Sequence, residues 1–303
     1  MKKYLAILPV FLHSCINGYI LRKFTRDRNT PKCLPMMLIE LIKLGISIFI
    51  KSGEPIKYNL EITVPTVFYF LQNLLLWNFA ARIDPLYFAT CYQSRIISLC
   101  IISILLLNKR FKMHQYFGQF LIFVGIILPE IFKENKIEKN NELIPCLGII
   151  LSGFLTSLSS VYFEHRIRNT ITYFWDYSFQ YSIYAVTLSF IASIIEFSVN
   201  EIDIWKFVLN VNFWLIIVTN SIGSMIISYL ATVICPLTRT FFMILASAAS
   251  TIVITFLLDS KLDIKNLFSF GIVYLGTSIY EYESLRKMFV KVTPKSKSPE
   301  EQI

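Results

Sequence analysis

The stretch of sequence with the fewest charges constrains this chain most. Between Phe207 and Leu258 the chain runs for about fifty residues and carries one charged residue, Arg239. A helix that crosses a bilayer needs roughly 20 apolar residues, so this stretch is long enough to cross twice. Pro236 disfavours helix at the residue before it and suits the first turn of a new helix. We therefore predict a membrane protein whose chain folds back at Pro236.

Charge clusters divide the rest of the chain into similar segments. Of the 303 residues, 55% are apolar and 16% are charged, whereas about a quarter of a soluble domain is charged. Ten spans would take about 200 residues, so we predict an all-α integral membrane protein with ten transmembrane helices and no soluble domain. The apolar segments lie near residues 4–21, 34–50, 62–81, 84–107, 115–132, 144–163, 171–195, 207–231, 237–258 and 266–282.

An even number of spans places both termini on one side of the membrane. Lys2 and Lys3 open the chain and a polar tail, 286–303, closes it, so we expect both termini in the cytosol. With the two ends included, that side of the membrane holds 15 Lys and Arg and the opposite side 12, so the positive bias is weak and the orientation rests mainly on the basic tail. We attribute the net charge of +9 to orientation and lipid headgroups, and expect membrane lipid but no nucleic acid as a partner.

Two weak internal matches indicate that the helices form two halves. NGYILRKF (17–24) resembles SVYFEHRI (160–167), and QYFGQFLIFVG (115–125) resembles NLFSFGIVYLG (266–276). Five helices in each half would make the halves inverted, as in transporters that bind substrate between them. Matches between apolar segments also arise by chance. The expected repeats run from about 1 to 135 and from about 142 to 285, within one domain, 1–303.

Charged side chains inside a span need a partner or a water-filled cavity, because each costs about 2.5–3.5 kcal/mol to insert. Glu40 and Lys43 lie three residues apart on one helix face, where they can pair. This pair either joins helices structurally or takes part in binding. Arg95 lies midway along a span with no carboxylate on its own segment. It either pairs with Glu40 or Glu164, or faces a cavity that admits an anion.

Arg239 follows Pro236 by three residues, which places it in the first turn of a helix. Free backbone N–H groups and the helix dipole favour anions there. The alternative is an arginine that extends to the membrane boundary. The charged residues within the spans are then three cations, Lys43, Arg95 and Arg239, and one anion, Glu40. Their net charge of +2 suits a dianionic solute.

Polar uncharged side chains add hydrogen-bonding groups within the third and fourth segments, although amides in membrane helices more often join helices than bind ligands. The sequence shows no Ser/His/Asp set, no pair of catalytic carboxylates and no His/Cys cluster with metal-ligand spacing, so we expect no catalytic residue, metal or cofactor. The polar side chains are Gln72, Asn73, Tyr92 and Gln93.

Six segments of the chain form a set of motifs whose order and spacing extend over nearly the whole chain. They are LRKFTR (21–26), IELIKL (39–44), VPTVFYFLQN (64–73), RIDPLYFATCYQSR (82–95), LLLNKRFKMHQY (105–116) and SVYFEHRI (160–167). Together they resemble the motifs of the nucleotide-sugar transporters of the drug/metabolite transporter superfamily, in the branch that carries UDP-galactose, UDP-N-acetylglucosamine and CMP-sialic acid.

The resemblance implies a fold of ten helices in two inverted five-helix repeats. It also implies exchange of a cytosolic nucleotide sugar for a lumenal nucleoside monophosphate. Arg95 and Arg239 stand where the family has Lys, so both keep the charge and add a bidentate fork for phosphate. By resemblance, the substrate-binding residues are Glu40, Lys43, Gln72, Asn73, Tyr92, Gln93, Arg95, Ser228 and Arg239, with a further role for Glu164.

This chain departs from the family motifs at several positions. Phe88 stands where the family has Tyr, Met113 where it has Lys, and Cys235-Pro236 where it has Asp-Asn. Either the contacts to base and sugar differ, or transport has been lost. Two alternatives therefore stand beside a nucleotide-sugar antiporter: a carrier of sugar phosphates or other organic phosphates, and a non-transporting scaffold of the same fold.

The resemblance places the chain in the Golgi membrane, with the endoplasmic reticulum as the alternative. The chain ends in EEQI, which is not a retrieval signal of either the dilysine or KDEL type. We expect a nucleotide sugar, best guess a UDP-sugar, and a nucleoside monophosphate as partners, and the chain could assemble as a homodimer.

Overall fold

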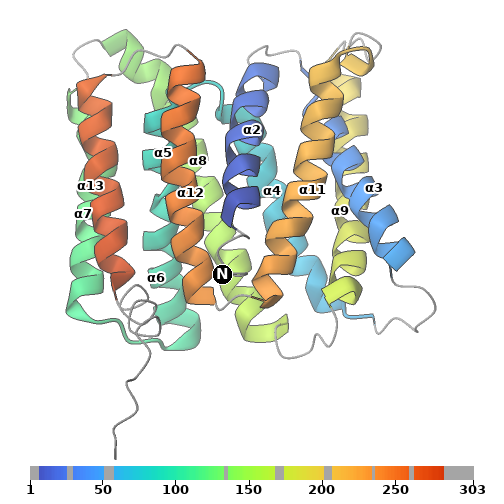
Figure 1. The fold of residues 1–303 in the computed structure, drawn as a ribbon, viewed down its shortest axis with the longest axis horizontal. Helices are drawn as coiled ribbons and strands as arrows, with labels where there is room; N and C mark the ends of the chain where they lie inside the picture. The colour runs from blue at the N-terminus through green and yellow to red at the C-terminus, as the bar shows by residue number, and fades with distance from the viewer. Residues whose placement is uncertain are drawn as a thin grey trace, which may run out of the picture.

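The computed structural model is a bundle of helices that stand side by side (Figure 1). It describes residues 7–25, 30–50, 58–132, 136–167, 174–200, 207–233, 236–258 and 263–282, and within this part every regular element is a helix. The helices are α2 (Ile7–Thr25), α3 (Cys33–Ile50), η1 (Leu60–Ile62), α4 (Thr63–Phe79), α5 (Pro85–Tyr92), α6 (Ser94–Leu107), α7 (Met113–Phe132), α8 (Lys136–Tyr162), η2 (Phe163–Ile167), α9 (Phe174–Val199), α11 (Val211–Val233), α12 (Pro236–Leu257) and α13 (Ile264–Tyr280).

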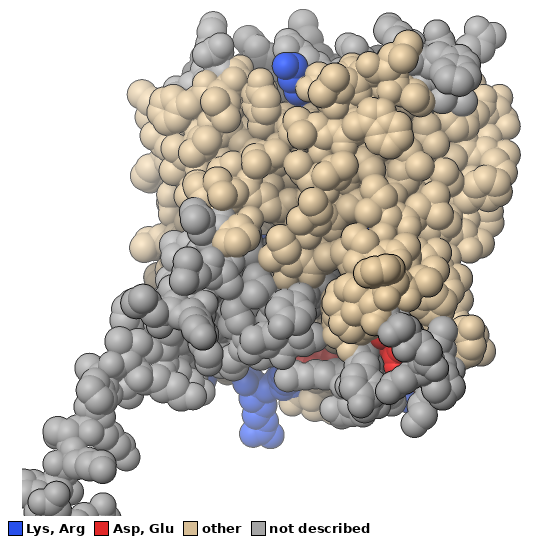
Figure 2. Space-filling view, turned by 45° about the vertical axis from the view of Figure 1, so that its right-hand side comes forward, with Lys and Arg blue, Asp and Glu red and all other residues tan. Residues whose placement is uncertain are grey.

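Length and composition make this a membrane protein. Five helical stretches are long and apolar enough to cross a bilayer, and three shorter helices are also apolar. Large apolar side chains face outward, among them Phe120, Phe268 and Ile195, each more than half exposed. In Figure 2, uncharged residues cover the middle of the visible face, and charged residues appear toward its upper and lower edges. Such a surface is suited to lipid. Ten spans stay a prediction.

Local sequence explains several helix boundaries. Asp84 caps α5 by accepting hydrogen bonds from the backbone N–H groups of Leu86 (2.8 Å) and Tyr87 (3.4 Å), and Pro85 occupies the first turn. The Asp263 side chain caps α13 in the same way. The predicted break at Pro236 is confirmed, because α11 ends at Val233 and α12 begins at Pro236.

The fourth apolar segment, predicted over 84–107, forms a helical stretch over Pro85–Leu107 that is long and apolar enough to cross a bilayer, but it is not one continuous helix. The structure divides it at Gln93 into α5 and α6. Two tight turns interrupt the helix there: the Gln93 N–H donates to the Thr90 carbonyl (3.2 Å), and the Ile96 N–H donates to the Gln93 carbonyl (2.9 Å). Neither proline nor glycine lies at the break, so the apolar pattern could not reveal it.

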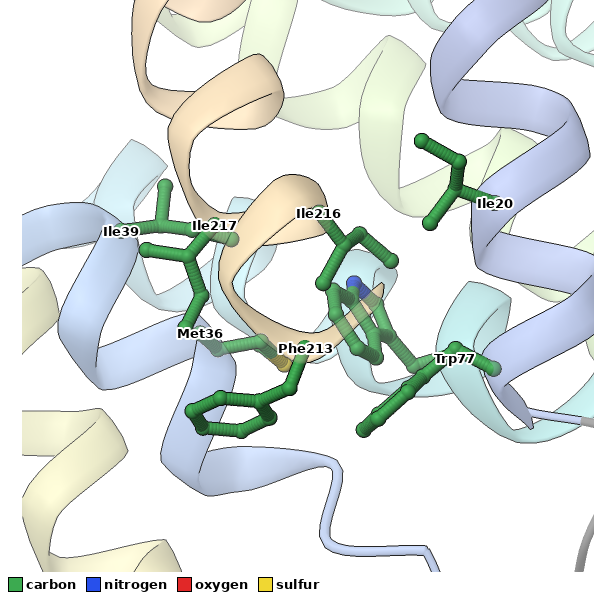
Figure 3. Close-up of a cluster of buried hydrophobic side chains, with 8 residues drawn as sticks. Ile20, Met36, Ile39, Trp77, Phe213, Ile216 and Ile217 are labelled. Atoms are coloured by element: carbon green, nitrogen blue, oxygen red, sulfur yellow. The ribbon is translucent and has the colours of Figure 1, made fainter. Parts of the chain in front are cut away.

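One large apolar cluster packs four helices together (Figure 3). Phe213 is fully buried, and Trp77 is 6% exposed. The ring of Phe24 packs against both, with centroid distances of 5.9 and 6.3 Å. The cluster joins α2, α3, α4 and α11 through Ile20, Phe24, Met36, Ile39, Trp77, Phe213, Ile216 and Ile217.

Helices from the two halves of the chain pack against each other. Helix α7 lies along α13, α3 along α9, α4 along α8, and α2 along both α11 and α12. In Figure 1, α7 and α13 occupy the left edge and α3 and α9 the right edge. The helices that contain the predicted site residues, α3 to α6, α11 and α12, therefore spread across the bundle.

Candidate functional site

Arg95 lies in the first turn of α6, directly after the break at Gln93. Its guanidinium carbon is 4.8 Å from the centre of the Tyr92 ring. Helix α8 holds the backbone in place, because the Ser157 hydroxyl donates to the Arg95 carbonyl at 2.7 Å. Gly153 permits this approach, since a Cβ at Gly153 would lie 3.2 Å from the Arg95 nitrogen. A half-buried cation therefore sits at a helix N-terminus within the bundle.

The two carboxylates that could have paired with Arg95 are engaged elsewhere. Glu40 pairs with Lys43 at 2.9 Å, as its spacing predicted. Glu164 pairs with Lys109 at 3.0 Å, and both side chains are 45% exposed. Among the residues that the structure describes, no carboxylate pairs with Arg95, so the alternative of an ion pair with Glu40 or Glu164 is wrong. Spacing along the chain gives Glu40 its partner, whereas long-range packing brings Lys109 to Glu164.

Gln93 contributes a buried acceptor beside Arg95. Its side chain is 1% exposed, and its Oε1 atom has no hydrogen-bond partner. The Tyr274 hydroxyl lies within hydrogen-bonding distance of the Gln93 side chain and 3.1 Å from the Ser247 Oγ. Arg95 is close enough to Tyr274 to interact electrostatically. Helices α5, α6, α12 and α13 thus meet at one group of polar side chains.

Ser247 and Tyr274 were missed by reasoning from the sequence. Both lie in apolar segments. Tyr274 falls within the matched segment 266–276, but nothing in the sequence marks either residue as part of a site. Only the packing of α12 and α13 against α5 brings them to Gln93.

Glu40 and Lys43 belong to a second group, on α3 and α9. Their side chains are 12% and 9% exposed. The Ser182 hydroxyl approaches the free carboxylate oxygen of Glu40 at 3.4 Å, and the Lys43 Nζ atom is 4.9 Å from the centre of the Tyr181 ring. Tyr69, on α4, packs edge-on against Tyr181. The Lys43 ammonium is therefore covered by a carboxylate and an aromatic face.

These two groups lie in different parts of the bundle. In Figure 1, α5 and α6 lie to the left of α2 and α4, and α3 and α9 lie to their right. The structure brings Tyr92, Gln93 and Arg95 together, but it does not place Lys43 among them.

A protein-family model decides the family. The model described as "Nucleotide-sugar transporter" matches residues 32–283. The chain belongs to the nucleotide-sugar transporter family. This confirms the resemblance seen in the motifs, and places the chain among membrane transporters rather than enzymes.

Named relatives share low identity with this nucleotide-sugar transporter family member. The UDP-galactose transporter of Schizosaccharomyces pombe is 23% identical over 73% of this chain and 64% of its own length. A UDP-galactose/UDP-N-acetylglucosamine transporter of Caenorhabditis elegans is 22% identical over 83% of this chain and 73% of its own. The UDP-N-acetylglucosamine transporter of Rattus norvegicus is 20% identical over 74% and 72%. This chain thus spans less than two thirds of the yeast relative.

A solved structure supports the fold assignment. A crystallised chain superimposes with a TM-score of 0.62 at 13% identity, covering 94% of this chain and 99% of the other. At that identity, the match shows a shared fold.

The remaining family positions fall on α4, α11 and α12. Gln72 is buried, and its Nε2 atom donates to the neighbouring Asn73 Oδ1 at 3.4 Å. Arg239 lies in the first turn of α12, as predicted, and Ser228 lies in α11. The side chains of Ser228 and Arg239 lie outside the described residues, so their predicted roles stay predictions.

The departures from the family motifs fit into the bundle. Phe88 stacks on Tyr92 with a centroid distance of 5.9 Å and 9° between the rings. Met113 is 84% exposed at the first residue of α7. Pro236 opens α12, where a proline is favourable.

Proposed function

We propose that this chain is an antiporter that exchanges a nucleotide sugar, a UDP-sugar, for a nucleoside monophosphate. The nucleotide sugar moves from the cytosol into the Golgi or endoplasmic-reticulum lumen, and the monophosphate leaves. The names of the relatives from yeast, worm and rat support UDP-sugars as the substrate class.

The observation that carries the proposal is Arg95, a cation without a carboxylate partner among the described residues. It lies in the first turn of α6, beside the interruption of the helix at Gln93 and within the bundle. Broken helices of this kind bind anionic groups of substrates in transporters. A diphosphate supplies such a group.

Gln93 and Tyr274 add hydrogen bonds to the same site. The free Oε1 atom of Gln93 can accept a hydrogen bond from a sugar hydroxyl or a base N–H. The proposed substrate-binding set also contains Glu40, Lys43, Gln72, Asn73, Tyr92, Arg95, Ser228 and Arg239. Lys43 can join it only if phosphate competes with Glu40, because the two now pair at 2.9 Å.

Alternating access would work through two inverted halves, about 1–135 and 142–285. If the two halves are equivalent, α4 corresponds to α11 and α8 corresponds to α2. The α4–α8 pair packs, and so does the equivalent α11–α2 pair. In the two matched segments, Gly118 is equivalent to Ser269, and Gly125 to Gly276. The backbones of Gly118 and Gly276 meet, as do those of Gly125 and Ser269. These pairings support a pseudo-twofold arrangement that could rock.

The proposal includes a Golgi location, with the endoplasmic reticulum as alternative, both termini in the cytosol, and contact with membrane lipid. A homodimer is compatible with the exposed apolar surface of α7 and α13, where Phe120 and Phe268 are 60% and 61% exposed.

Ligand-induced thermal stabilisation of the purified protein tests the substrate class. We expect UMP to raise the unfolding temperature more than GMP, CMP or glucose 6-phosphate, because a ligand that binds only the folded state stabilises it. Stabilisation by glucose 6-phosphate alone would indicate an organic-phosphate carrier. No response to any of these compounds would contradict a phosphate site and favour a scaffold.

A further inference from the structure

Four flat side chains form a continuous stack from α2 to α6. The Arg22 guanidinium carbon lies 4.9 Å from the centre of the Phe88 ring. Phe88 and Tyr92 are parallel, with centroids 5.9 Å apart, and Arg95 lies 4.8 Å from the centre of the Tyr92 ring. The two rings are four residues apart on α5 and therefore share one helix face. The stack has an arginine at each end.

The Arg22 end of the stack is anchored. Arg22 is 8% exposed, and its Nη1 atom donates to the Ile83 carbonyl at 2.9 Å. Ile83 directly precedes Asp84, which caps α5 and attracts Arg22 electrostatically. The opposite end, Arg95, is half-buried and follows the helix break. The contacts of Arg22 with the start of α5 therefore fix the Arg22 end of the stack.

We propose that Arg22 and Phe88 are positioning residues that fix the guanidinium of Arg95 for nucleotide phosphate; this rests on the proposed function. A guanidinium is attracted to the face of an aromatic ring. Phe88 restrains the Tyr92 ring from one side. The Arg95 guanidinium, which packs against this ring, is therefore held in one preferred orientation. A preoriented arginine loses less conformational freedom when it binds phosphate, so its affinity is higher.

The stack also accounts for phenylalanine at position 88, where the resembling motif has tyrosine. Both contacts of Phe88 in the stack are made by the face of its ring. Neither needs a hydroxyl, so replacing tyrosine with phenylalanine preserves the stack.

Binding of UMP and of uridine to the purified protein tests the proposal, because only UMP carries phosphate. Phe88→Leu removes the aromatic face, and we expect it to weaken UMP affinity about three- to tenfold while uridine affinity stays the same. Phe88→Tyr keeps the face and should stay within about twofold of wild type. Equal losses for UMP and uridine would overturn the proposal, since they would indicate a general disturbance of the site.

Phe213→Leu is the matched control. It removes an aromatic ring from the fully buried cluster around Trp77 (Figure 3) and leaves the stack intact. We expect it to lower stability without changing the ratio of UMP to uridine affinity. A change in this ratio as large as that in Phe88→Leu would overturn the proposal.

A double-mutant cycle separates this proposal from the proposed function. If the stack acts through Arg95, Phe88→Leu should cause no further loss of UMP affinity in an Arg95→Ala background. Additive losses would overturn the stack as a positioning device. If Arg95→Ala alone leaves UMP affinity unchanged, the phosphate role of Arg95 in the proposed function is wrong, whatever the effect of Phe88→Leu.

Arg22→Lys provides a milder variant should Phe88→Leu fail to fold. It keeps the positive charge and a donor for the Ile83 carbonyl but lacks the planar guanidinium that faces Phe88. We expect a selective loss of UMP affinity of about two- to fivefold. Unchanged UMP affinity in a folded Arg22→Lys protein would remove Arg22 from the proposal.

Discussion

Gly118 and Gly276 bring the backbones of α7 and α13 into direct contact. A Cβ atom at Gly118 would lie 2.6 Å from the Gly276 carbonyl oxygen, and a Cβ at Gly276 would lie 2.7 Å from that of Gly118. Small residues allow such close packing of helices in membranes, where apolar burial alone does not drive association. One glycine from each half of the chain therefore sets the spacing of this helix pair.

Gly276→Ala should separate α7 from α13 and destabilise the protein by about 1–3 kcal/mol, the usual cost of overpacking. The thermal unfolding midpoint in detergent measures the effect. Gly271→Ala is the control on the same helix, because a Cβ there meets nothing within 4 Å. It should leave the midpoint unchanged or raise it, since alanine favours helix. Equal destabilisation by both variants would refute a spacing role for Gly276.

Removing one partner of the Glu40–Lys43 pair should be costly. Lys43→Met leaves the mostly buried Glu40 carboxylate without its cation, and we expect a loss of about 3–5 kcal/mol. The double variant Glu40→Leu/Lys43→Met should recover much of this loss, because neither charge then remains. Thermal unfolding of the three proteins gives the comparison. A double variant no more stable than Lys43→Met would contradict this explanation, because the loss would then not come from the unpaired charge.

Glu196 caps α3 from a distant helix. Its carboxylate accepts hydrogen bonds from the backbone N–H groups of Lys32 (2.9 Å) and Cys33 (2.8 Å). Glu196→Ala should lower stability by about 1 kcal/mol, as other lost caps do. Glu196→Gln, which keeps one acceptor oxygen, should cost less. If the two variants unfold at the same temperature as wild type, the cap makes no net contribution.

Both arginines of the proposed phosphate site can be tested by nucleotide affinity. A charge-assisted hydrogen bond contributes about 1.5–3 kcal/mol, so Arg95→Ala and Arg239→Ala should each weaken UMP binding by roughly ten- to a hundredfold. Arg→Lys should cost less, because the charge remains. Loss of folding in Arg95→Ala, together with unchanged affinity in Arg239→Ala, would make Arg95 structural and Arg239 a boundary residue.

Local sequence predicted the features that depend on local chemistry. The break at Pro236 and the Glu40–Lys43 pair each follow from residues close together in the chain, and the structure contains both. Of the predicted apolar segments, five appear as helical stretches long enough to cross a bilayer and three as shorter apolar helices among the described residues. The partner of Glu164 could not be predicted, because Lys109 approaches it only through the packing of distant segments.

The centre of the candidate site was only partly predictable. Arg95 and Gln93 stood out as polar groups in an apolar segment, and the resemblance supplied their roles. The break at Gln93 depends on two tight turns, and no residue type in that segment predicts them. Tyr274 and Arg22 reach the site from α13 and α2, so their contacts depend on the three-dimensional arrangement of the helices.

Counterflow in reconstituted vesicles tests whether the protein exchanges its substrates at a site built around Arg95. Labelled UDP-galactose or UDP-N-acetylglucosamine is added outside vesicles that are empty or preloaded with UMP. We expect preloading with UMP to accelerate uptake by the wild-type protein, and Arg95→Ala to lose most of this acceleration. Two results would show that exchange at this site does not occur. The first is uptake that is equally slow with empty vesicles and with vesicles preloaded with UMP, GMP or CMP, and the second is an Arg95→Ala protein as fast as wild type.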